Sequence, residues 1–241
     1  MPASAGRDPV RTWIRRALCA AALVGVLAFW AGLWMAARTY PSEYDWRYMT
    51  ISGLVYPDRN PDGYRWAWRG LMLCALGGLC WTTVLLHDWK QGSAGRRPVG
   101  IWALGVGYLC MVSCAWLPGW FPRIPKGHDL LALFSFFGLC IGIVRLTLHL
   151  AQQSPRLRPR NVPGYCRLYA GLLAGVALSP ILLAAITQAY IPHARPDLPW
   201  VGLEWRARGA PVYLSFAFWE WTTCAVFSAY TISLCLATMT I

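Results

Sequence analysis

Glu220 is the acid in this sequence with the strongest potential for chemistry, because it stands alone among apolar residues in FAFWEWTT. An ionised carboxylate inside a membrane is costly unless it is paired, hydrated or near a helix end. Counted from Pro211 at about 1.5 Å per residue, Glu220 lies roughly 13 Å along a helix, too far for its short side chain to reach the surface. We therefore expect it to face a bundle interior, either protonated or paired with a base. Arg69 is the first candidate for that base and His128 the second.

These residues predict an outward-facing pocket, because Arg69 lies near the start of one apolar stretch and His128 and Asp129 lie at the start of another. A histidine beside an acid can act as a general base, and an arginine can bind phosphate or carboxylate with two hydrogen bonds. The predicted catalytic residues are His128 and Glu220, and the predicted substrate-binding residues are Arg69, Asp129, Trp219 and Trp221. The alternative is structural: Asp129 stabilises a helix N-terminus, and Glu220 with Arg69 forms an ion pair.

The histidines and cysteines predict no metal site and no cofactor. No two of the four histidines are spaced to share a helix face as i, i+4, and no H-E-x-x-H motif occurs. The nine cysteines lie in or beside apolar stretches and include no C-x-x-C pair, so we expect neither a disulfide framework nor a zinc site. The segment 58–63, with Asp58, Asn60 and Asp62, lacks the distal glutamate of a calcium loop and predicts a turn.

The elements that must position these residues are membrane helices. Of the 241 residues, 57% are hydrophobic and only 13% are charged, whereas about a quarter are charged in a typical soluble domain. Because about 20 mostly apolar residues cross a bilayer, the sequence predicts an all-α, polytopic six-helix transmembrane bundle that forms one integral membrane domain, 1–241. The approximate spans are 17–37, 66–86, 99–117, 130–150, 168–190 and 211–238.

The basic residues favour cytoplasmic termini and exclude a nucleic-acid partner. The net charge is +12, but the basic residues lie between apolar runs and form no continuous face for nucleic acid. With both termini inside, eleven basic residues lie in inner segments and ten in outer ones, and the dense cluster Arg11, Arg15 and Arg16 precedes the first span. The outer loops are then 38–65, 118–128 and 191–210, whose aromatic and charged residues predict a structured cap.

Three short features carry a resemblance to known membrane proteins. They are Ile51-Ser52 after the first span, a proline-containing turn that ends at Tyr64, and His128 at the mouth of the fourth span. In these the chain resembles the six-span DUF998 family and, more distantly, the Frag1/DRAM/Sfk1 group, although the segment with Trp219 to Trp221 matches neither pattern. The resemblance implies a six-helix bundle associated with lipid handling, and it implies no catalytic residues.

Three functions are compatible with this sequence. The first is a protein that binds or modifies a lipid or lipid-linked headgroup from the extracytoplasmic side, with membrane lipids as its partners. The second is a small proton-coupled transporter, which an intramembrane glutamate favours, although no inverted repeat is visible. The third is a non-catalytic accessory or scaffold subunit, in a homo-oligomer or with a partner membrane protein, packed through small residues such as Gly70, Gly77 and Gly78.

Overall fold

The computed structural model describes residues 9–92, 98–120, 127–157, 165–194 and 202–240, and within these ranges it contains helices and no β-strand. The long helices are α1 (Pro9–Arg38), α3 (Tyr64–Gly92), α4 (Val99–Trp120), α5 (Gly127–Leu157), α6 (Tyr165–Ala194) and α8 (Phe216–Thr240). The short ones are α2 (Ile51–Val55), α7 (Glu204–Ala207) and the 3₁₀ helix η1 (Val212–Leu214). The all-α prediction is therefore confirmed.

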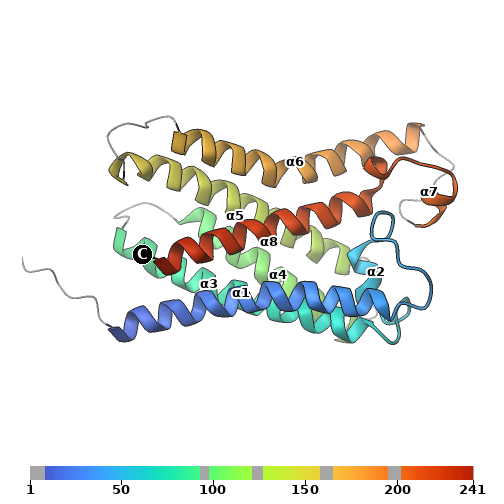
Figure 1. Cartoon of the computed structure of the whole chain (residues 1–241), viewed down its shortest axis with the longest axis horizontal. Coiled ribbons are helices and arrows are strands. Elements are labelled where there is room, and N and C mark those ends of the chain that lie inside the picture. Colours follow the sequence, from blue (N-terminus) through green and yellow to red (C-terminus); the bar gives the residue numbers. More distant parts are fainter. Residues whose placement is uncertain (1–8, 93–97, 121–126, 158–164, 195–201, 241) are drawn as a thin grey trace, which may run out of the picture.

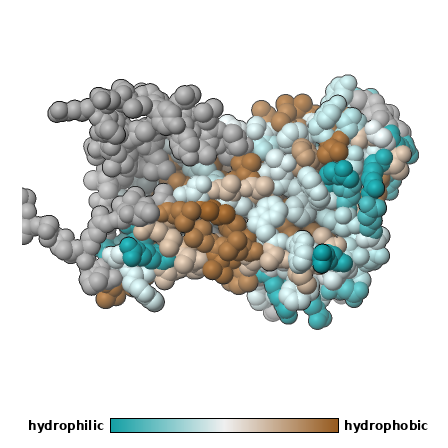
Figure 2. All heavy atoms as spheres, viewed as in Figure 1, coloured by the Kyte–Doolittle hydropathy of each residue, from teal (hydrophilic) through white to brown (hydrophobic). Residues whose placement is uncertain are grey.

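Four of the helices are long and apolar enough to cross a membrane, and they identify a multi-pass membrane protein. They are Val10–Arg38, Tyr64–Trp89, Val99–Trp116 and Gly127–Leu148. In α6 the apolar part found within the described residues is shorter, Leu178–Ile191, so the structure does not confirm a count of six spans. Large apolar side chains are exposed along these helices, and Figure 2 shows apolar residues across the middle of one face with hydrophilic residues toward its ends.

The long helices form a closed ring of neighbours. Along the chain, α1 contacts α3, α3 contacts α4, α4 contacts α5, α5 contacts α6 and α6 contacts α8, and α8 returns to contact α1. Figure 1 shows that α1 begins and α8 ends at the same end of the bundle, while α2 and α7 lie at the opposite end. The two ends of the described chain therefore share one side, as an even number of crossings requires. We refer to the end that carries α2 and α7 as the cap end.

Glycines let α1 and α3 approach at backbone distance. A Cβ atom on Gly32 would lie 2.5 Å from the carbonyl oxygen of Trp66, and one on Gly70 would lie 2.6 Å from that of Ala28. Gly25 faces α3 in the same way, seven residues from Gly32, which is about two helical turns and therefore the same face. Small residues at such a contact allow the close van der Waals packing on which membrane helix association depends.

The segment between α1 and α3 is held to the bundle by a turn that contains the buried Asn60. The predicted turn is confirmed: the backbone N–H of Asn60 donates to the carbonyl of Tyr56, and that of Tyr64 donates to the carbonyl of Asn60. The Asn60 side chain is fully buried; its Nδ2 donates to the carbonyl of Ala36 at 3.0 Å, and its Oδ1 accepts from the N–H of Gly63 at 3.1 Å. Asn60 thus ties the end of α1 to the start of α3.

Candidate functional site

Two loops fold together at the cap end. The Tyr48 hydroxyl donates to the carbonyl of Ala210 at 2.9 Å, and the N–H of Gly202 donates to the carbonyl of Tyr48 at 3.1 Å. Trp205 is only 1% exposed and packs against Tyr48 and Ile191. The structured cap predicted from the sequence is therefore present for the first and third loops, whereas most of the second loop, 118–128, lies outside the described residues.

Charged residues reinforce the contact between the two loops. Arg47 donates to both carboxylate oxygens of Asp45, from Nε and Nη2, at 2.8 Å each. From the other loop, Nη1 of Arg206 lies 2.5 Å from Glu43 and 3.6 Å from Asp45. The hydrogen bond from the Arg47 side chain lowers the pKa of Asp45 below its ordinary value, although burial acts in the opposite direction. Asp45 is buried and lies near both Arg47 and Arg206, so it is the central acid of this cluster.

Glu220 lies about one turn into α8, closer to the start of the helix than the sequence predicted. The segment from Pro211 is not continuous helix, because η1 covers Val212–Leu214 and Ser215 adopts an extended conformation before α8 starts at Phe216. Counted from Phe216, Glu220 lies about 6 Å along the helix instead of roughly 13 Å. The expected continuous helix from Pro211 was wrong, because periodicity and hydropathy do not reveal the break at Ser215.

The partner of Glu220 is a backbone group in the cap. Its Oε2 accepts a hydrogen bond from the N–H of Ile51 at 3.0 Å, at the first residue of α2. Next to it, Nε1 of Trp221 donates to the carbonyl of Met49 at 3.1 Å. The first turns of α8 thus hold the segment that leads into α2, because the free N–H groups at a helix start require acceptors.

Arg69 does not pair with Glu220 in the described part of the chain, and this expected ion pair is therefore a wrong prediction. Helical periodicity places Ala67 and Gly70 against α1, which leaves Arg69 exposed on another face of α3. Its guanidinium lies over the ring of Trp66, with Cζ 5.8 Å from the ring centroid. Arg69 is thus oriented toward the surroundings of the bundle.

His128 lies at the far end of α2 from Glu220. Its ring packs on Tyr56, which follows the last residue of α2, at a centroid distance of 4.9 Å. Its Nδ1 is 3.3 Å from a carboxylate oxygen of Asp129, which is 74% exposed. Glu220 contacts the start of α2 and His128 contacts the residue after its end, and no described contact joins the two predicted catalytic residues. The structure brings His128 and Asp129 together.

The two tryptophans that flank Glu220 diverge. Nε1 of Trp219 donates to the carbonyl of Tyr213 at 2.7 Å, whereas the ring of Trp221 lies between Trp30 and Tyr44, at centroid distances of 5.9 Å and 6.3 Å. Trp221 also lines the larger of two cavities, so one predicted substrate-binding residue does face a groove.

That cavity, which we call the aromatic groove, runs between α1 and α8 below the cap and has a volume of about 540 Å³. It is lined by Trp30, Leu33, Trp34, Ala37, Tyr44, Trp46, Trp221, Thr222 and Ala225. Trp46 stacks on Phe218 at a centroid distance of 5.9 Å and closes the cap side. Sequence reasoning missed this site, although a signal was present: Trp30, Leu33, Trp34 and Ala37 follow the i, i+3, i+4, i+7 spacing of one helix face.

Arg38 lies at the rim of the aromatic groove. Its Cζ is 4.3 Å from the ring centroid of Trp34, and both residues are exposed. A guanidinium over an indole face is a favourable cation–π contact. The groove therefore combines an apolar aromatic wall with a positive charge at its end.

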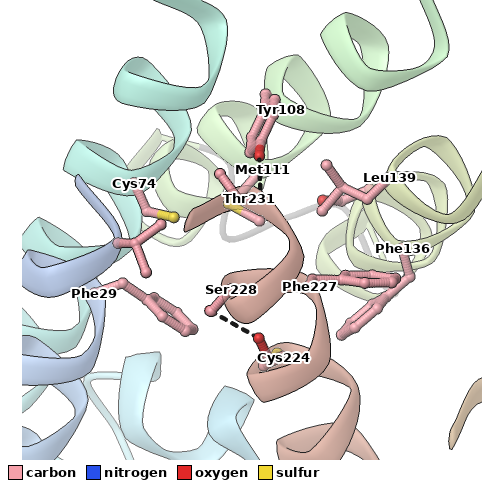
Figure 3. A pocket seen from close by; sticks show the side chains of 12 residues that line it. Phe29, Cys74, Tyr108, Met111, Phe136, Leu139, Cys224, Phe227, Ser228 and Thr231 are labelled. Atoms are coloured by element: carbon pink, nitrogen blue, oxygen red, sulfur yellow. Dashed lines mark hydrogen bonds between the residues drawn. The ribbon is translucent and has the colours of Figure 1, made fainter. Parts of the chain in front are cut away.

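A second, smaller cavity of about 60 Å³ lies inside the bundle (Figure 3). Its walls are mostly apolar, with Phe29, Phe136 and Phe227 among them. Three of its polar groups bond to each other or to the backbone: the Tyr108 hydroxyl is 3.4 Å from that of Thr231, and Ser228 donates to the carbonyl of Cys224 at 2.8 Å. By volume it holds a few water molecules, so the aromatic groove is the better candidate for a ligand site.

The described residues contain no group of three or more His, Cys, Asp or Glu side chains that could hold a metal ion. The eight cysteines whose side chains the structure describes are free thiols. In comparisons with known proteins, no family model, no curated protein and no solved structure matches this chain.

Proposed function

We propose that this protein is a multi-pass membrane protein that binds a lipid, or the lipid part of a lipid-linked headgroup, from the extracytoplasmic side. The observation that carries the proposal is the aromatic groove between α1 and α8, which is apolar, lined by exposed Trp34 and Trp46, and bordered by α1, one of the four helices long and apolar enough to cross a membrane. A volume of about 540 Å³ lies within the roughly 300–1,000 Å³ of typical ligand pockets.

Lipid binding has more structural support than catalysis. The Glu220 carboxylate is engaged by the N–H of Ile51, His128 packs on Tyr56, and no described contact joins these two predicted catalytic residues. The small residues on which an accessory role would rest are occupied within the chain: Gly70 faces Ala28, and a Cβ on Gly78 would meet the ring of Tyr108. Among the readings that the sequence left open, lipid binding therefore has the most direct structural support.

The proposal includes six spans, with α6 and α8 crossing the membrane beside the other four, and a cap on the extracytoplasmic side. The dense basic cluster of α1 lies at the opposite end, where Arg15 pairs with Asp88 at 3.2 Å. For orientation, Asp62→Cys at the cap and Arg16→Cys on α1 should be treated with a membrane-impermeant maleimide in intact cells, with the unsubstituted chain as control. We expect labelling of Asp62→Cys only; the reverse would place lipid binding in the inner leaflet.

The lipid-binding test is photocrosslinking in nanodiscs with phospholipids that carry a diazirine on an acyl chain. We expect labelled peptides from 30–37 and 221–225, and Ala225→Trp should reduce that labelling at least fivefold because it fills the groove from α8. Ala229→Trp is the matched control: Ala229 is exposed one helical turn further along α8 and does not line the groove. Equal labelling of the two variants would contradict the proposal.

A further inference from the structure

We propose that the aromatic groove selects an anionic glycerophospholipid, with Arg38 binding the phosphate of the headgroup while one acyl chain lies in the groove. This inference rests on the proposed function and adds the class of lipid and the residue that recognises it.

The first step is the position of Arg38 relative to the groove. Trp34 has two roles, since one part of its ring lines the groove and the guanidinium of Arg38 lies 4.3 Å from its centroid. Arg38 stands at the last residue of α1, whereas the lining residues Trp30 to Ala37 precede it over about 10 Å of helix. A chain that occupies the groove along α1 thus leads directly to this guanidinium.

The second step is the charge left at the rim. Arg47 is paired with Asp45, and Arg206 with Glu43, so these two arginines of the cap loops are already matched by carboxylates. Within the described part of the chain, Arg38 has no carboxylate partner, and the ring of Trp34 is its described contact. Arg38 therefore brings to the groove a positive charge with no described carboxylate beside it, which is complementary to one phosphate.

The third step is the chemistry of the guanidinium. When a guanidinium stacks on an aromatic ring, its N–H groups point outward in the guanidinium plane and remain free to donate. Two of them can donate in parallel to two oxygens of one phosphate. The end of an apolar helix is where headgroups begin, and aromatic residues such as Trp34 and Trp46 favour this layer. A phosphate bound there fixes the position of the lipid along the groove. A headgroup with a net negative charge then binds more tightly, because Arg38 has no described carboxylate partner.

The experiment compares phosphatidylglycerol with phosphatidylcholine, each carrying the same acyl diazirine, in nanodiscs of otherwise equal composition. In the unsubstituted protein we expect groove labelling by phosphatidylglycerol to exceed that by phosphatidylcholine about fivefold, the ratio that corresponds to ~1 kcal/mol for one basic residue at an anionic surface. Arg38→Gln should bring this ratio near one, and Arg38→Lys should retain part of it.

The matched control is Arg59→Gln, since Arg59 is also exposed at the cap end and lies over an aromatic ring, 5.8 Å from Tyr56, but not at the groove. It should leave the ratio unchanged. A ratio near one in the unsubstituted protein, or a ratio that survives in Arg38→Gln, would overturn the inference while lipid binding itself stands. Absence of groove labelling by both lipids would instead refute the proposed function. A merely structural role of Arg38 would lower stability without changing the ratio.

Discussion

The carboxylate of Glu220 on α8 accepts a hydrogen bond from the backbone N–H of Ile51, at 3.0 Å, and so joins the start of one helix to the start of another. The two residues are 169 positions apart in the chain. Ile51 is the first residue of α2, and the N–H group at that position of an α-helix has no intrahelical acceptor. The hydrogen bond of Glu220 therefore links the bundle to its cap.

The first prediction concerns this hydrogen bond. Glu220→Ala leaves the N–H of Ile51 without its acceptor and should lower the free energy of unfolding by about 1–3 kcal/mol, whereas Glu220→Gln keeps an oxygen acceptor and should cost less than about 1 kcal/mol. Thermal unfolding in a mild detergent measures both. Glu220→Gln and Arg69→Gln should be additive within about 0.5 kcal/mol, because the two side chains do not pair. A coupling above about 1 kcal/mol would show that they do.

The second prediction is a pH dependence of the cap. Because Arg47 lowers the pKa of Asp45 in the folded state, ionised Asp45 stabilises the fold fully above the ordinary carboxyl pKa of about 3.9. This contribution is lost as the pH falls from there through the lower folded-state pKa. Unfolding measured from pH 7 to pH 3 should show Asp45→Asn less stable than the unsubstituted protein at neutral pH, with the difference shrinking as the pH falls below about 3.9. Asp62→Asn, an exposed acid, is the control and should not change the profile.

The third prediction addresses the turn that contains Asn60. Asn60→Ala removes the donor to the carbonyl of Ala36 and the acceptor for the N–H of Gly63, both inside the protein, and should cost about 2–3 kcal/mol of stability. Asp62→Ala, exposed in the same turn, should change stability by less than about 0.5 kcal/mol. Similar effects of the two substitutions in chemical or thermal unfolding would mean that Asn60 is not a structural anchor.

The fourth prediction tests the contact between α1 and α3. Gly70→Ala places a Cβ 2.6 Å from the carbonyl oxygen of Ala28, where backbone must move, and should destabilise the protein by about 1–3 kcal/mol. Gly175→Ala on α6 is the control, since a Cβ there meets nothing within 4 Å, and it should be neutral or stabilising by up to about 1 kcal/mol. The comparison can be made by thermal unfolding in detergent; a neutral Gly70→Ala would refute the close approach.

Hydropathy and local turn chemistry were enough to predict the all-α class, the multi-pass character and the turn that contains Asn60. These properties depend on residues close together in the chain, because about 20 apolar residues in succession favour a membrane helix whatever follows them. Even so, local pattern placed the last helix too early. It starts at Phe216, because the backbone leaves the helical conformation at Ser215.

The partners of the candidate residues were decided only by the tertiary structure. Local spacing shows that Trp30 and Trp34 share one face of α1, but it does not show that α8 brings Trp221 to within 5.9 Å of Trp30. In the same way, the spacing on α3 is compatible with an inward Arg69 until Gly70 is seen to occupy the face against α1. Which faces meet depends on how the helices are ordered and rotated in the ring. That order follows from backbone contacts between distant glycines and from the fold of the cap, which no local periodicity contains.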